Sequence, residues 1–224
     1  MLRYTRWMRP LRLAAFGLTL LGVLSVRADT WPWPSAGEQS RHSTGIVLLG
    51  PIDYDAIRNT EPFEGPLRKA WSDSFTLAQE AEPDLLGYPW ADRKSGELVV
   101  SIADPRGVEI IQQWVRSGLQ VPSPKPGGPF TIDLPRPEVP VRIVSVQHSI
   151  RGLERIMDGV TDLIRAGVPG ADRINSVGPD YEHDRVIIVT DRLNDQLLEV
   201  IAARFGVDVI AVRIDPMATP MHSL

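Results

Sequence analysis

The chain has 224 residues, of which 43% are apolar and 23% charged, and it contains no cysteine. This length and composition support a hydrophobic core in one or two domains and exclude an intrinsically disordered protein. The lack of cysteine excludes disulfides, thiolate nucleophiles, thiolate zinc sites and cysteine-held iron–sulfur clusters.

Residues 1–28 have the pattern of a Sec-type signal peptide. Four positive charges come first, at Arg3, Arg6, Arg9 and Arg12. The apolar run 13–26 is short of the roughly 20 residues that span a bilayer, so we expect cleavage between Ala28 and Asp29 and a secreted bacterial protein. An uncleaved membrane anchor that begins at Leu11 is the alternative.

Removal of residues 1–28 changes the charge balance. The segment carries five of the 24 basic residues and none of the 28 acidic ones, which leaves 19 against 28 and a net charge of −9. Nucleic acids and anionic membranes bind basic surfaces, so we expect neither as a partner.

The upstream half predicts a small ββα-type lobe over 45–121. Residues 29–44, with two Trp-Pro pairs, read as an extended lead-in, and 46–49 as a short strand. A helix over 66–82, a hairpin over 90–103 and a helix over 107–117 follow, the last opened by Asp104-Pro105. Seven prolines make 122–140 a stiff linker, from which 130–132 could return one strand to the first lobe.

The last third, 141–214, alternates between strand and helix periods in the order βαββαβ. That order predicts a ferredoxin-like unit and an α+β fold, with both helices on one face of an antiparallel or mixed sheet. Ser149 and Asn194 are the predicted N-caps of the two helices. The strand over 185–190 is continuously apolar and should be central, whereas 174–177 suits an edge. Residues 215–224 form a tail.

One resemblance follows from the hairpin Trp90–Asp104 and its helix, and from the stretch Val177–Gly206 with its polar turn. These patterns resemble the pro-regions of secreted chymotrypsin-like bacterial proteases of the alpha-lytic type, and also stand-alone exported actinobacterial proteins built from the same elements. The resemblance covers about residues 66–214 and implies a two-lobed domain that packs its sheet against a protease, assisting its folding and then inhibiting it. No protease domain follows, so such a protein would act in trans.

Few residues suggest chemistry. Asp180-Tyr181-Glu182-His183-Asp184 is the best metal candidate, because it brings three carboxylates and an imidazole to one turn. Turn formation explains the same residues, and no EF-hand or two-histidine spacing accompanies them. We therefore predict no catalytic residue, no metal ligand and no cofactor.

The remaining polar candidates have structural explanations. Ser149, after His148, is expected to cap a helix rather than act as a nucleophile. His42 lies in the lead-in and His222 in the tail, while Asp158 and Asp162 share a solvent face. No Walker loop, dinucleotide fingerprint or two-histidine zinc helix is present.

The sequence therefore predicts an exported, non-catalytic binding protein that uses an uncovered sheet face or an edge strand, with a secreted protease as a possible partner. A small metal-dependent hydrolase that uses carboxylates near 180–184 is the main alternative, and a domain that binds a small molecule between its lobes is the third. A pocket that brings His148 or His183 against carboxylates would favour the hydrolase.

Overall fold

The computed structural model describes residues 38–51, 64–122 and 131–218, which belong to one compact unit that spans Pro32–Leu224. The predicted signal peptide, its cleavage site and His222 lie outside the described residues. Within the described ranges no helix is both long enough and apolar enough to cross a bilayer.

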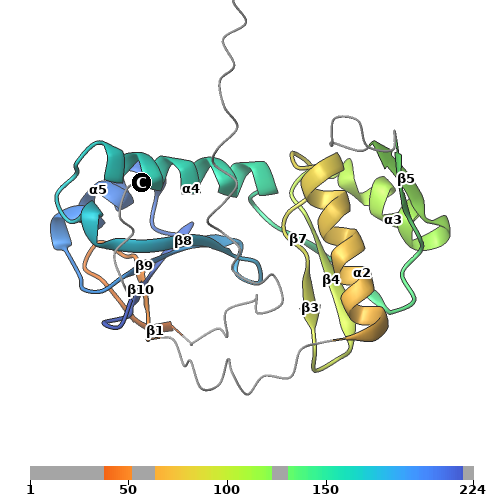
Figure 1. Cartoon of the computed structure of the whole chain (residues 1–224), viewed down its shortest axis with the longest axis horizontal. Helices are drawn as coiled ribbons and strands as arrows, with labels where there is room; N and C mark the ends of the chain where they lie inside the picture. Colours follow the sequence, from red (N-terminus) through yellow and green to blue (C-terminus); the bar gives the residue numbers. More distant parts are fainter. Residues whose placement is uncertain (1–37, 52–63, 123–130, 219–224) are drawn as a thin grey trace, which may run out of the picture. The chain divides into compact units, whose positions relative to one another are not determined.

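The fold is mixed α+β, as the sequence predicts (Figure 1). The strands are β1 (Glu38–Arg41), β2 (Val47–Leu49), β3 (Trp90–Asp92), β4 (Glu97–Ile102), β5 (Leu119–Pro122), β6 (Thr131–Leu134), β7 (Val141–Ser145), β8 (Ile174–Asp180), β9 (Arg185–Thr190) and β10 (Ile210–Ile214). The helices are α2 (Gly65–Thr76), α3 (Gly107–Ser117), α4 (Ile150–Arg165) and α5 (Asp195–Phe205). A π-helical turn, Leu77–Ala81, extends α2.

Local signals in the sequence explain these helices. Ser149 Oγ accepts a hydrogen bond from the Gly152 N–H at 3.1 Å, and Asn194 Oδ1 accepts one from the Leu197 N–H at 2.9 Å, so both predicted N-caps are confirmed. Gly206 ends α5 at φ 90°, a conformation that favours glycine.

The strands form three sheets. A five-stranded sheet has the order β1-β2-β10-β9-β8, a three-stranded sheet the order β3-β4-β7, and β5 pairs with β6. In the first sheet β10 is the middle strand. As predicted, β9 is an interior strand with both faces buried and β8 lies at an edge. The pairing of β5 with β6 confirms that a strand returns within the proline-rich segment.

The ferredoxin-like pairing is not confirmed. The elements follow in the predicted order, but β7 pairs in parallel with β4, and β10 has β9 on one side and β2 on the other. The strands β2 and β7 are thus exchanged relative to the predicted lobes, and β1 forms where an extended lead-in was expected. Hydrophobic periodicity specifies a strand and its buried face but not the partner of that strand.

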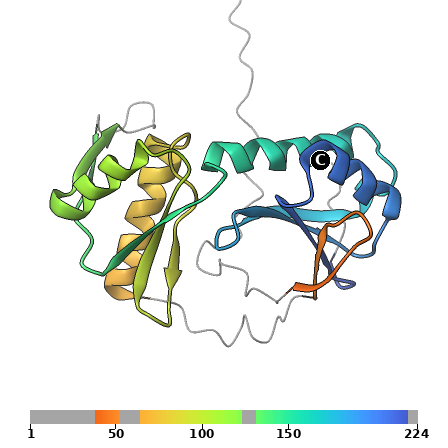
Figure 2. The ribbon, with the colours of Figure 1, turned by 180° about the vertical axis from the view of Figure 1, so that it is seen from behind.

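Both faces of the five-stranded sheet are buried. In Figure 1 and Figure 2, α4 and α5 lie on one side of it, and their apolar residues share a core with Val186, Ile188 and Val212. Side chains of the opposite face are only 0–5% exposed, namely Val47, Leu49, Ile187, Val189 and Ala211. The described residues of this sheet therefore do not form the uncovered face that the sequence predicts.

The predicted tail begins as packed structure. The Asp215 N–H donates to the Thr190 carbonyl at 2.8 Å, and Asp215 itself is 2% exposed. Ala218 packs against the second buried face of the sheet. The segment up to Ala218 thus belongs to the folded unit.

Candidate functional site

The outer edge of β7 is an unpaired strand edge with a regular register. The strand β7 pairs with β4 over five residues without a register shift and contains neither proline nor glycine. By contrast, β1 and β8 carry irregular registers, β8 also contains Pro179, and β3 has only three residues. Bulges, prolines and short length are the usual devices that block edge pairing, and β7 has none of them.

The ladder between β4 and β7 determines which groups point outward. The Leu98 N–H donates to the Pro140 carbonyl at 2.9 Å, and the Val146 N–H donates to the Ile102 carbonyl at 3.0 Å. Backbone groups alternate along a parallel strand, so the N–H groups of the even-numbered residues point toward β4. The N–H and C=O groups of Val141, Ile143 and Ser145 therefore point away from the sheet.

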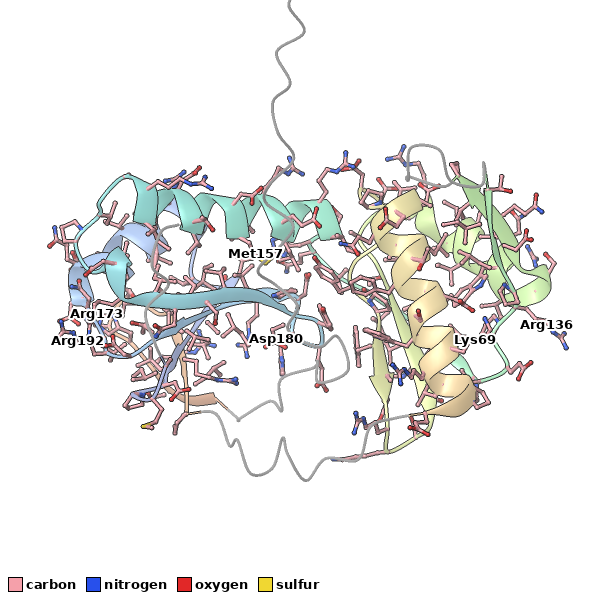
Figure 3. The ribbon with its side chains drawn as sticks, viewed as in Figure 1. Lys69, Arg136, Met157, Arg173, Asp180 and Arg192 are labelled. Carbon is pink, nitrogen blue, oxygen red and sulfur yellow. The ribbon has the colours of Figure 1, made fainter. Side chains whose placement is uncertain are left out.

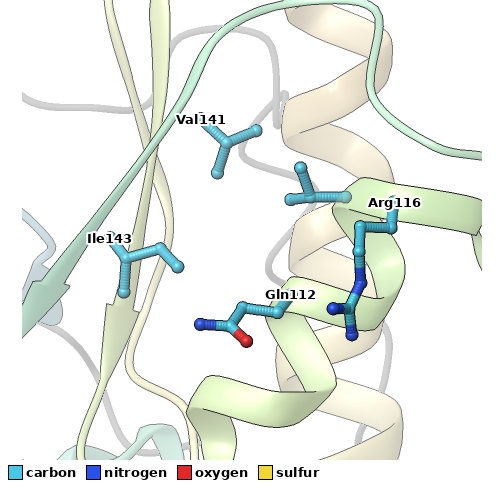
Figure 4. A pocket seen from close by; sticks show the side chains of 5 residues that line it. Gln112, Arg116, Val141 and Ile143 are labelled. Carbon is cyan, nitrogen blue, oxygen red and sulfur yellow. The ribbon is translucent and has the colours of Figure 1, made fainter.

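An apolar groove lies beside this edge, between β7 and α3 (Figure 4). Its volume is about 240 Å³, and it is lined by Gln112, Val115, Arg116, Val141 and Ile143. The side chains of Val115 and Ile143 are 36% and 40% exposed and are two of four large apolar residues exposed in the described part of the chain. Edge and groove together can bind an extended segment, because the edge offers main-chain hydrogen bonds and the groove accepts its side chains.

Asp184 connects the turn between β8 and β9 to the junction of β7 with α4. Its Oδ2 accepts hydrogen bonds from the N–H groups of Gln147 at 2.6 Å and His148 at 3.0 Å, and it lies 3.2 Å from His148 Nδ1. Asp184 also has φ 51°, a left-handed conformation that Asp tolerates better than most residues. These contacts fix the end of β7 to the five-stranded sheet.

Aromatic side chains strengthen the same connection. Tyr181, next to Asp180 in the turn, stacks on Tyr88 with ring centroids 4.7 Å apart, and Phe75 contacts both rings. The Ile150 N–H, at the start of α4, donates to the Leu86 carbonyl at 2.8 Å. These aromatic contacts and this hydrogen bond help to fix the position of the segment that follows β7.

A polar cavity of about 570 Å³ lies where β7 ends. It is lined by Trp90, Val144, Ser145, Val146, Gln147, His148, Glu182, His183, Asp184 and Asp208. Glu182, His183 and Asp208 are exposed, so the cavity opens to solvent. Val144 lies on the face of β7 opposite to Ile143 and lines the polar cavity together with Ser145, the last residue of the strand, whereas the apolar groove lies beside Val141 and Ile143.

The turn 180–184, which is the best metal candidate in the sequence, is organised by ion pairs within the chain. Asp180, at the end of β8 (labelled in Figure 3), binds His183 Nδ1 at 3.0 Å with one oxygen and Arg185 Nε at 2.9 Å with the other. Burial acts to raise the pKa of Asp180, but its hydrogen bond from His183 and the charges of His183 and Arg185 prevail and lower it. In the described part of the chain no group of three or more His, Asp or Glu residues is arranged to hold a metal ion.

The pair of His183 with Asp180 predicts a pH dependence of stability. The hydrogen bond that His183 donates to Asp180 raises the pKa of His183 above 6.5, so the stabilisation is complete below that pH and is lost as the pH rises through the folded-state pKa. His183 is 43% exposed, which limits the loss to about 0.5 kcal/mol. Urea unfolding at pH 6 and 8 should show this decrease in the wild type and not in His183→Gln; an equal decrease in both would contradict the assignment.

The other candidate residues serve structural roles. His42 Nδ1 lies 3.1 Å from Thr44 Oγ1, and its Nε2 lies 3.3 Å from Asp195 Oδ1 at the start of α5. Asp158 and Asp162 are exposed on α4, as predicted. Residues that sequence reasoning missed are Trp90, Gln147 and Asp208 in the polar cavity and Ile143 at the edge, because only the tertiary pairing brings them together.

No protein-family model matches the chain, and no curated protein matches it.

Proposed function

We propose that this chain is an exported, non-catalytic protein that binds an extended segment of a partner protein, which adds as a strand to the outer edge of β7. The observation that carries the proposal is the combination of an unprotected five-residue edge with an apolar groove beside it. The predicted signal peptide supports export, and the net charge of −9 makes a basic or neutral protein a better partner than nucleic acid or an anionic membrane.

The sharper form of the proposal is a chaperone or inhibitor that acts in trans on a secreted protease. The resemblance of residues 66–214 to protease pro-regions supports this form. Because both faces of the five-stranded sheet are buried, the edge of β7 replaces the sheet face as the docking surface in this proposal. A pro-region-like protein needs no cofactor, since it works by shape and main-chain pairing.

The experiment adds the purified protein to the proteases of the culture supernatant and measures casein cleavage, with Ile143→Pro as the matched variant. The proposal predicts that the wild type inhibits and that the variant does not. Unchanged cleavage with the wild type, at a protein concentration well above that of the protease, would contradict the protease form. Equal inhibition by both proteins would contradict the edge as the docking strand.

A small hydrolase is the second candidate, because the polar cavity does bring His148 against a carboxylate, Asp184. The geometry supports it less well. The Asp184 oxygen also accepts two backbone N–H groups, and Ser149 Oγ is occupied as the cap of α4. Hydrolysis of nitrophenyl esters that is lost in His148→Gln would favour this candidate over the first.

A further inference from the structure

We infer that the polar cavity at the end of β7 binds a lysine or arginine side chain of the segment that occupies the edge. The inference rests on the proposed function and adds the chemistry of the partner. It makes the partner an extended segment in which a basic residue alternates with apolar ones.

The strand β7 has an apolar groove and a polar cavity beside it. Val141 and Ile143 line the apolar groove on one face of β7, whereas Val144, on the other face, and Ser145, at the end of the strand, line the polar cavity. A strand that pairs with β7 projects its own side chains alternately to the same two faces. Neighbouring residues of the partner would therefore enter different environments, one apolar and one polar.

The side chains that line the polar cavity carry a negative net charge. The cavity is lined by three carboxylates and two imidazoles, and by no lysine or arginine. Its lining carries a charge of −3 when both imidazoles are neutral and −1 when both are protonated, so it is negative in either state. Glu182 and Asp208 form no ion pair with another described residue, which leaves both carboxylates available to a cation.

Arg142 and Arg185 already form ion pairs with carboxylates outside the cavity lining. Arg142, on the Val144 face of β7, lies 3.2 Å from Glu97 Oε2 and 3.5 Å from Asp92 Oδ2. Arg185 is paired with Asp180. Neither arginine neutralises Glu182 or Asp208 by direct contact.

Trp90 and the size of the cavity select the kind of cation. Trp90 lines this cavity of about 570 Å³ and is half-buried. Indole rings bind ammonium and guanidinium groups, and the long aliphatic stems of lysine and arginine pack against apolar surface. A basic side chain on an extended segment meets these conditions and is supplied by the same strand that fills the groove.

The test uses two capped seven-residue peptides, one in which valine alternates with lysine and one in which glutamate replaces lysine. Binding is followed by NMR through the amide signals of Val141, Ile143 and Ser145. We expect the lysine peptide to shift these signals and to bind at least about tenfold more tightly than the glutamate peptide, with an affinity that falls as NaCl rises.

Charge reversal at the cavity provides the matched variants. The double variant Glu182→Lys/Asp208→Lys should weaken binding of the lysine peptide about tenfold or more. A control, Glu199→Lys, makes the same type of charge change at an exposed position of α5 outside the cavity and should leave binding within about twofold.

The outcomes separate the two proposals. Equal binding of both peptides with shifts at β7 would overturn the basic-residue inference and leave the edge as the docking strand. Shifts confined to residues away from β7, or no binding of either peptide, would overturn both.

Discussion

Replacement of Ile143 by proline is expected to weaken partner binding about 100-fold while the protein stays folded. The Ile143 N–H points away from β4, so proline removes a donor that only an added strand would use. The side chain is 40% exposed, and its loss from the groove should cost about 1 kcal/mol of folding free energy.

The measurement is a binding titration with the lysine peptide or with a captured protease, together with urea unfolding of each variant. Ile143→Val serves as the control, because it keeps both the N–H donor and an apolar side chain. We expect its affinity to stay within about threefold of the wild type. Wild-type affinity in the proline variant would exclude β7 as the docking strand.

Removal of the Asp184 carboxylate should cause the largest loss of stability at the site. In Asp184→Ala the N–H groups of Gln147 and His148 lose their charged acceptor, and alanine must adopt φ 51°. Together these effects should lower the free energy of unfolding by about 3 kcal/mol.

Two further variants divide this loss between its causes. Asp184→Asn keeps an acceptor and tolerates the left-handed conformation, so it should lose only about 1 kcal/mol. Asp184→Gly relieves the backbone but provides no acceptor, and it should fall between the other two. Urea unfolding at neutral pH measures all three. A loss below about 0.5 kcal/mol in Asp184→Ala would show that the carboxylate does not hold the end of β7 in place.

Local signals in the sequence predict the helices, both N-caps and the interior position of β9 correctly. Ser149 and Asn194 act within three residues of themselves, and the apolar run 186–189 reports burial on both faces. The pairing of β7 with β4 and of β2 with β10 could not be predicted, because several edges accept a Val-rich strand equally well.

In the candidate site, too, the sequence predicts local features but not the contacts between distant segments. In the turn 180–184, Asp180 pairs with His183 and Arg185, and Asp184 accepts hydrogen bonds from the backbone of residues 147 and 148. That assignment needs the contact between the turn and the end of β7, which no local pattern encodes. The groove between α3 and β7 depends likewise on the strand pairing.

The most direct test of the β7 edge is amide hydrogen exchange of the protein with and without its bound partner, with the lysine peptide as the first probe. We expect the outward-facing amides of Val141, Ile143 and Ser145 to become protected from hydrogen exchange when the partner binds. We expect little change at Arg142 and Val144, whose N–H groups already point toward β4. Protection that appears instead along β8, or that leaves β7 unchanged, would contradict the account.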